Sequence, residues 1–251
     1  MIHYHGLPIT GSGDPLLSMA RRHCMVSYAH SDQVDTASEI CQSFTLDNGA
    51  FTAWKGGKEF DFDGFCDFAT KWALHPGCDW FLLPDVIDGT VDDNQKMRAK
   101  FFNSVDRAVH RKGVPIWHLH EPLELLEYFT RLDAPAVALG SSGDYAQVGT
   151  GKWWGRMAEA MKVACHDNGF PKARLHGLRM LDPDVFTRLP LSSADSTNVA
   201  RNVGIDSAWK GAYSPHSRRM RAEIMMERIE MNNSAPFWNE PLAIQQDMKL
   251  I

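Results

Sequence analysis

The sequence predicts an α/β protein folded as a single (β/α)₈ TIM barrel over residues 1–251. Short apolar runs alternate with longer amphipathic segments almost from end to end. Eight such runs in roughly 250 residues match the size and rhythm of this barrel, and polar residues crowd the carboxyl ends of the runs. An open doubly wound sheet is the alternative, but residues 11–14 are too short a match to its glycine-rich first turn.

The apolar runs predict strands at 2–5, 24–28, 43–46, 79–83, 115–119, 136–139, 174–177 and 191–194. Helical periodicity between them is clearest at 62–74, 92–111, 122–131, 152–168 and 217–231. In the fourth of these segments Trp154, Met157 and Met161 recur at three- and four-residue steps before Asn168-Gly169 ends the helix. No linker or repeat interrupts the alternation, which favours one domain.

Composition and charge exclude several classes of protein. The chain has 251 residues, a mean hydropathy of −0.31 and a net charge of −5, and no apolar run approaches the roughly 20 residues that cross a bilayer. Its first residues lack the pattern of a signal peptide, so we expect a cytoplasmic protein, in the host cell if a phage encodes it. The five cysteines are scattered without a CxxC pair, which argues against a disulfide framework or a zinc knuckle.

A local excess of positive charge lies at 201–221, within a basic segment and C-terminal helix expected at about 201–231. Only Asp206 opposes its cations, which are Arg201, Lys210, Arg218, Arg219 and Arg221. Because phosphate contacts depend on the local field, this segment could hold a polyanion on an otherwise acidic chain. A solvated helix start and loop is the simpler interpretation.

Acidic residues end three of the predicted strands: Asp47, Asp85 and Asp195. The carboxyl ends of barrel strands converge, so the three should share one site. One carboxylate can trap an oxocarbenium-like sugar while another moves the proton, which is the chemistry of a glycosidic bond. Each aspartate alone could instead cap a turn or a helix.

The histidines permit a rival interpretation, a metal-dependent amidohydrolase with a water-activating ion. Its ligands would be His3, His5, His118 or His120, and Asp195. The sixth run reads Leu139-Gly140-Ser141 where such a site needs a histidine, so His176 would have to replace it.

Five short motifs at successive strand ends carry a resemblance. They are Asp47-Asn48-Gly49-Ala50-Phe51, Leu83-Pro84-Asp85, Leu139-Gly140-Ser141, Leu175-His176-Gly177 and Ser193-Ala194-Asp195-Ser196-Thr197. Their order and spacing, over residues 1 to about 205, resemble the tRNA-guanine transglycosylase superfamily, most closely the phage and bacterial branch that inserts 7-deazaguanine bases into DNA.

The resemblance implies base exchange at a nucleoside without metal or organic cofactor. Asp195 matches the nucleophile that attacks C1′, and Asp47 matches the residue that protonates the leaving base and deprotonates the incoming one.

The resemblance also implies a set of base contacts. Asp85 matches the acceptor for the purine N–H edge, Gly140 and Ser141 match a loop that contacts the base carbonyl, and His176-Gly177 matches the wall on which the base packs. His118 or His120 replaces the glutamine usual in this superfamily.

We expect a substrate other than the tRNA of the tRNA branch. Members of that branch carry a zinc-binding insertion with a CxCxxC motif, which this chain lacks. We therefore expect DNA and a 7-deazaguanine such as preQ0 as partners, with no membrane and with a homodimer possible. An RNA substrate and a catalytically silent binding subunit are the alternatives. Retention of both Asp47 and Asp195 opposes the silent subunit. The target nucleotide would be flipped or single-stranded. Expected phosphate contacts are Arg201, Lys210, Arg218 and Arg219, and candidate stacking residues are Tyr145, Trp153, Trp209 and Tyr213.

Overall fold

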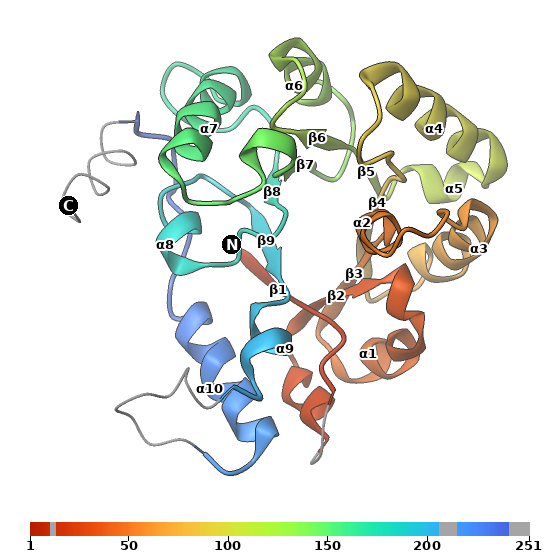
Figure 1. Ribbon diagram of the computed structural model, residues 1–251, viewed down its shortest axis with the longest axis vertical. Coiled ribbons are helices and arrows are strands. Elements are labelled where there is room, and N and C mark those ends of the chain that lie inside the picture. Colours follow the sequence, from red (N-terminus) through yellow and green to blue (C-terminus); the bar gives the residue numbers. More distant parts are fainter. Residues whose placement is uncertain (11–13, 206–214, 241–251) are drawn as a thin grey trace.

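The described residues, 1–10, 14–205 and 215–240, form a nearly closed barrel of parallel strands in the computed structural model (Figure 1). Its strands are β1 (Ile2–Gly6), β2 (His23–Ser27), β3 (Ser43–Asp47), β4 (Cys78–Leu82), β5 (Gly113–Val114), β6 (Ile116–His118), β7 (Val137–Gly140), β8 (Leu175–Gly177) and β9 (Ser193–Ser196). They follow the order β5-β4-β3-β2-β1-β9-β8-β7-β6, and every neighbouring pair is parallel. The predicted α/β barrel is thus confirmed, and the open sheet is wrong.

The ring is nearly closed where β5 is followed by β6: the predicted strand 115–119 corresponds to β6 alone, and β5 precedes it. β5 pairs with β4, β6 pairs with β7, and only Pro115 separates them. Proline has no N–H for a strand ladder, so the chain changes partners at this residue. The two ends of the strand order are therefore consecutive in the chain.

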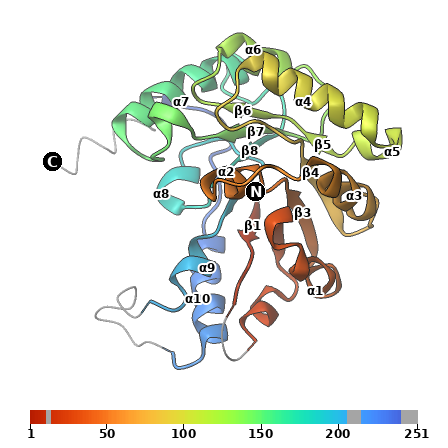
Figure 2. The same cartoon turned by 45° about the vertical axis from the view of Figure 1, so that its right-hand side comes forward.

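Most of the helices lie outside the ring of strands, whereas α2 (Ala50–Lys55) is drawn over β3 and β4 (Figure 1). The others are α1 (Val34–Ile40), α3 (Phe62–Ala73), α4 (Val91–Ser104), α5 (Arg107–His110), α6 (Leu123–Phe129), α7 (Gly151–Ala164), α8 (Pro183–Phe186), α9 (Asn198–Asn202) and α10 (Arg218–Glu230), with short 3₁₀ turns η1 (Pro15–Met19), η2 (Tyr28–Gln33) and η3 (Gly143–Tyr145). Among these helices none is long and apolar enough to cross a membrane. Helices α9 and α10 lie side by side (Figure 2).

One predicted helix, 92–111, is wrong in its continuity. α4 begins at a capping box formed by Thr90 and Asp93, in which each side chain bonds the backbone N–H of the other residue. It ends at Ser104, because the side chain of Asp106 accepts from the N–H of Ala108 and starts α5. A second N-cap inside the periodic segment therefore divides it.

Strand alternation determines which side chains enter the barrel. Tyr4, Trp80, Ile116 and Ala138 pack together inside it, whereas a larger apolar cluster joins the outer face of the strands to the helices. The ring of His176 lies among the inner residues, with its centroid 4.7 Å from that of Trp80. The interior below the carboxyl ends is thus filled by three aromatic rings and by aliphatic side chains.

Candidate active site

The three predicted carboxylates meet at the carboxyl end of the barrel. Asp47 is the last residue of β3, Asp195 lies in β9, and Asp85 follows β4 in the loop. The charges of Asp195 and Asp85 both act on Asp47. Strand ends far apart in the sequence therefore place three acids within electrostatic reach of one another.

Asp195 is held by hydrogen-bond donors on one oxygen. Its Oδ1 accepts from the backbone N–H of Arg179 at 3.0 Å and faces Nε2 of His176 at 3.3 Å. Nδ1 of His176 is hydrogen-bonded to the hydroxyl of Ser193 at 2.9 Å, which fixes the ring. Asp195 is 6% exposed, so its second oxygen is oriented in a largely water-free setting.

Asp47 has different surroundings. It is partly buried and accepts the backbone N–H of Gly49 at 3.3 Å. Burial raises the pKa of Asp47 to about 6, and the charges of Asp195 and Asp85 act in the same direction, while Ser27 and the Gly49 N–H oppose them. Near neutral pH this carboxyl can both give and take a proton.

Asp85 is fixed between an amide and an imidazole. Its Oδ1 accepts from Nδ2 of Asn48 and its Oδ2 accepts from Nε2 of His118, each at 2.8 Å. Burial by itself lowers the pKa of His118, but the hydrogen bond and charge of Asp85, with Glu121, raise it overall. The buried side chain of Glu121 also accepts the backbone N–H of His118 at 2.7 Å.

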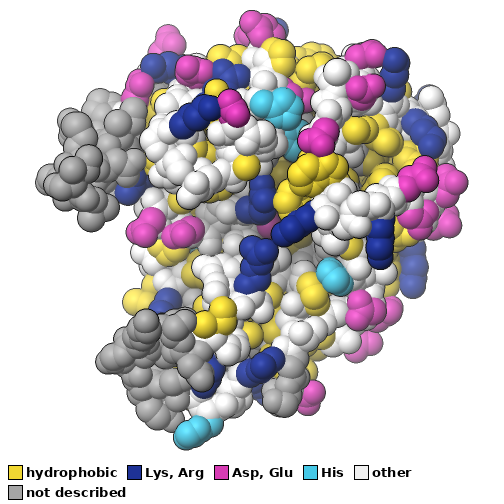
Figure 3. Space-filling model, in the orientation of Figure 1, with side chains coloured by type: hydrophobic (Ala, Val, Ile, Leu, Met, Phe, Trp, Pro, Cys, Tyr) yellow, Lys and Arg dark blue, Asp and Glu magenta, His cyan; other side chains and the backbone are white. Residues whose placement is uncertain are grey.

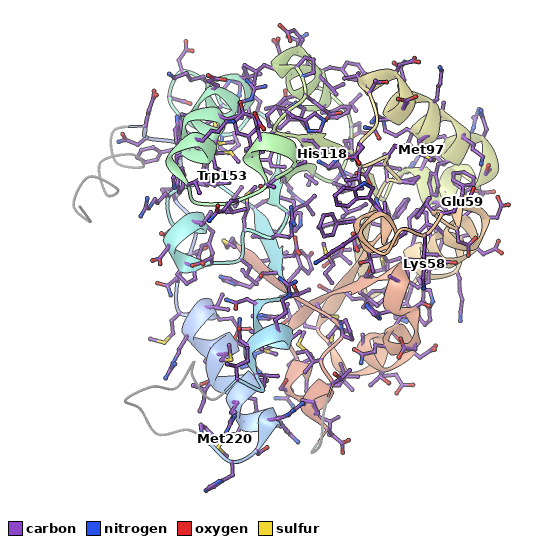
Figure 4. All side chains as sticks on the ribbon, viewed as in Figure 1. Lys58, Glu59, Met97, His118, Trp153 and Met220 are labelled. Atoms are coloured by element: carbon purple, nitrogen blue, oxygen red, sulfur yellow. The ribbon has the colours of Figure 1, made fainter. Side chains whose placement is uncertain are left out.

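The two histidines at the end of β6 are not equivalent. His118 is buried and lies on the inner side of the barrel (Figure 4), whereas His120 is exposed and its Nδ1 is 2.6 Å from the hydroxyl of Ser142. Their rings lie nearly parallel, at 19° and 5.7 Å between centroids. Of the pair, His118 is the one joined to the carboxylates.

The predicted base-contact residues divide between the two faces of the barrel wall. Gly140 faces inward, and its backbone comes close to the ring of His118. Ser141 is buried, and its Oγ accepts from Nε1 of Trp153 on α7. A Cβ on Gly177 would lie 2.8 Å from Leu191 in the outer cluster, whereas the neighbouring ring of His176 packs against Trp80 inside the barrel.

Gly140→Ala should displace the imidazole of His118. A Cβ at this position would lie 2.7 Å from Nδ1 of His118, nearer than real Cβ contacts come. We expect a loss of about 1–3 kcal/mol in the free energy of unfolding, measured by urea denaturation. Gly155→Ala on α7 is the control, because its Cβ meets nothing within 4 Å and should stabilise the helix by about 0.4–1 kcal/mol. Equal effects at both sites would contradict the tight packing of Gly140.

Arg179 is a site residue that the sequence did not identify. Its backbone adopts a left-handed φ of 58°, which aims its N–H at Asp195. The guanidinium donates to the carbonyl of Ser141 at 2.5 Å and lies 4.8 Å from the ring of Phe51 on α2. Burial lowers the pKa of Arg179, and the charges of Asp195 and Asp47 oppose that effect. The one feature of the sequence that points to Arg179 is its place in the loop after the predicted strand 174–177.

The ligand set of the rival amidohydrolase is wrong in this fold. His3 and His5 flank the inward-facing Tyr4 and therefore point out of the barrel. Nε2 of His3 is 3.0 Å from the carbonyl of Asn232, and Nε2 of His5 is 2.9 Å from Glu230 on α10. In the part of the chain that is described, no group of three or more His, Cys, Asp or Glu side chains could hold a metal ion.

Three of the four predicted phosphate contacts lie among the described residues, and each has different partners. Arg201 on α9 is exposed, and its charge acts on Arg179. Arg218 donates to the carbonyl of Thr10 at 3.4 Å, Arg219 is ion-paired with Glu223, and Lys210 lies outside the described residues. Figure 3 shows Lys and Arg side chains around the centre of the face that carries α2 and α9.

Two of the four predicted stacking residues lie in the described part of the chain. Trp153 is fully buried, so its proposed stacking role is wrong, and Tyr145 is half-buried against the core. Trp209 and Tyr213 lie outside the described residues. Among the described residues, Phe51 and Trp54 expose their rings on α2, the helix that begins shortly after Asp47. Their helix has only six residues, too few for periodicity to reveal it.

Comparison of the chain with protein-family models and with curated proteins gives no match.

Proposed function

We propose that this protein exchanges guanine in DNA for a 7-deazaguanine base such as preQ0, through a covalent aspartyl–sugar intermediate. The barrel would be a (β/α)₈ barrel whose fifth strand is β5 and β6 together, without a zinc-binding insertion. The observation that carries the proposal is that two carboxyls of one site differ. Asp195 accepts hydrogen bonds on one oxygen, and the pKa of Asp47 is raised to about 6. Two neighbouring carboxyls in unlike surroundings suit two different roles.

The first step forms a bond between a carboxylate oxygen of Asp195 and C1′ of the nucleotide. The C1′–N9 bond breaks, its electron pair leaves with guanine, and protonated Asp47 supplies the proton. In the second step ionised Asp47 removes the N9 proton of the incoming base. That nitrogen attacks C1′, and the carboxylate of Asp195 leaves with the electron pair of its C–O bond. Both residues return to their starting states, so the exchange needs no cofactor.

Asp85, His118 and Gly140 would contact the base. Asp85 can accept from the N–H edge of a guanine-like ring, although Asn48 and His118 already use part of its hydrogen-bonding capacity. A backbone N–H near Gly140 would meet the base carbonyl. Because His118 bonds Asp85, its role would be to hold that carboxylate in place for the base.

The contact between Arg179 and Phe51 would have to open for the sugar to reach Asp195. Asp195 is 6% exposed, and the guanidinium lies 4.8 Å from a phenyl ring that is itself 40% exposed. A planar base could take the place of the guanidinium on this ring. The guanidinium of Arg179 would then contact a phosphate of the strand or the carboxylate of Asp195.

Incubation of the protein with preQ0 and guanine-containing DNA tests the proposal. We expect the nucleoside digest to contain the 7-deazaguanine deoxynucleoside and the supernatant to contain free guanine, both detected by mass spectrometry. A parallel incubation with RNA of the same sequence separates DNA from RNA as the substrate. Tight preQ0 binding with neither product would contradict base exchange and favour a silent binding subunit.

A further inference from the structure

Two exposed aromatic side chains of α2 form a row beside the carboxylates. Phe51 and Trp54 are three positions apart, which places them on the same side of the helix. Their ring centroids are 5.6 Å apart at 38°, and the rings are 40% and 48% exposed. Together with the guanidinium of Arg179 on Phe51, the row runs outward from the site.

Trp54 is held in place although its ring is open to solvent. Its Nε1 donates to a carboxylate oxygen of Asp88, in the loop that follows β4. The polar atom of the indole is therefore satisfied, and the exposed part of the side chain is apolar. A large, fixed, exposed indole is well suited to stack against a planar group, since little conformational freedom remains to be lost.

Cations surround this row of rings. Arg179 lies on Phe51, the charge of Arg201 acts on Arg179, and Lys55 is exposed at the end of α2. Lys58, just beyond the end of α2, is exposed as well (Figure 4). Two acidic residues lie nearby as well: Asp88 accepts a hydrogen bond from Trp54, and Glu59 follows Lys58. Figure 3 shows apolar and basic side chains adjoining each other over α2. Planar rings bordered by cations match the bases and phosphates of a polynucleotide.

We propose that Trp54 stacks on the nucleotide next to the target nucleotide, so that the protein takes a single-stranded segment of nucleic acid. In a duplex the base faces are covered by their neighbours and would not meet an indole outside the site. This inference rests on the proposed base exchange for the identity of the target, while the binding surface itself can be tested without any turnover.

The test is the affinity for a guanine-containing single strand, measured by fluorescence anisotropy. Trp54→Ala is expected to weaken binding about 10- to 100-fold, the range for loss of one base–aromatic stack. Trp54→Phe keeps a ring but loses the N–H, and Asp88→Asn weakens the anchor, so both should stay within about threefold of the parent. Wild-type affinity in Trp54→Ala, or equal loss in Trp54→Phe and Trp54→Ala, would overturn the proposal.

A matched control lies at the other end of the barrel. Phe170 precedes β8 and pairs with Phe237 at 5.9 Å and 48°, and it is 51% exposed. Phe170→Ala should leave strand binding unchanged, and an equal loss there would contradict a specific surface. A paired duplex should bind less tightly than either single strand; equal binding would overturn the preference for single strands. RNA binding with the same dependence on Trp54 supports the surface and assigns the strand to RNA.

A second measurement needs no variant and remains valid if Trp54→Ala fails to fold. Irradiation of the wild-type complex with a strand that carries 5-iododeoxyuridine beside the guanine should crosslink the peptide containing Trp54. Crosslinks confined to other peptides would overturn the proposal. Because neither readout requires exchange, loss of the stacking role and failure of base exchange are separate results.

Discussion

Asp195→Asn is expected to lower the rate of guanine exchange by more than about 10⁴-fold. An amide is a very poor nucleophile towards C1′, whereas its oxygen can still accept the N–H of Arg179 that now bonds Asp195. The fold should therefore survive the change. The measurement is release of labelled guanine from DNA in the presence of excess preQ0.

Asp79→Asn is the control for this variant. Asp79 is exposed near the start of β4, where Tyr4 and Ser43 donate to it, away from the three carboxylates. Its rate of exchange should equal that of the parent protein. Exchange by Asp195→Asn within tenfold of the parent would show that another group is the nucleophile.

Asp47→Asn should lower activity and raise stability at the same time. Loss of the proton carrier is expected to slow exchange about 10²- to 10⁴-fold. The folded protein raises the pKa of Asp47 from 3.8 to about 6, so between these values the unfolded chain is ionised while the folded chain is still protonated. The free energy of unfolding therefore falls as the pH rises through this window. Above the window, the folded protein bears the full free-energy cost of ionising Asp47.

The stability effect of Asp47→Asn should thus depend on pH. At pH 8 the variant should gain about 1–3 kcal/mol in the free energy of unfolding, because the cost of ionising the partly buried carboxyl of Asp47 is gone. At pH 4 the gain should be close to zero. Urea denaturation of both proteins at the two pH values measures this difference. A destabilised variant at pH 8, or the same change at both pH values, would contradict the raised pKa.

The barrel was predictable because its strands carry two independent signals. The first signal is the series of short apolar runs, and the second is the polar residues that follow these runs. Pro115 was visible in the sequence, but the change of strand partner at this residue depends on the geometry of the nearly closed ring. The short helix α2 escaped prediction because six residues hold less than two turns.

The orientation of His3 and His5 could not be read from the sequence. They stand directly before and after Tyr4 and must share the opposite face, but neither face of the strand is marked as polar by its neighbours. Only the packing of Tyr4 against Trp80 inside the barrel settles the direction. Arg179 could not be identified from the sequence for a similar reason. Its contact with Asp195 needs a left-handed backbone, which the sequence does not specify for arginine.

The three carboxylates were predictable because strand ends in a parallel barrel must meet, whatever the loops do. Their differences were not. The raised pKa of Asp47 depends on burial and on the charges of Asp195 and Asp85, and the fixed orientation of Asp195 depends on His176 and Arg179. Identity and order of residues thus indicate a site, while packing assigns the roles within it.

The covalent intermediate is the most direct test of the proposed chemistry. The protein should be incubated with guanine-containing DNA without free 7-deazaguanine, denatured, and digested for peptide mass spectrometry. We expect a DNA-bound peptide with the sugar on Asp195, which disappears when preQ0 is added before denaturation. A covalent bond at another residue, or guanine exchange with no adduct on Asp195 at any time, would contradict the mechanism.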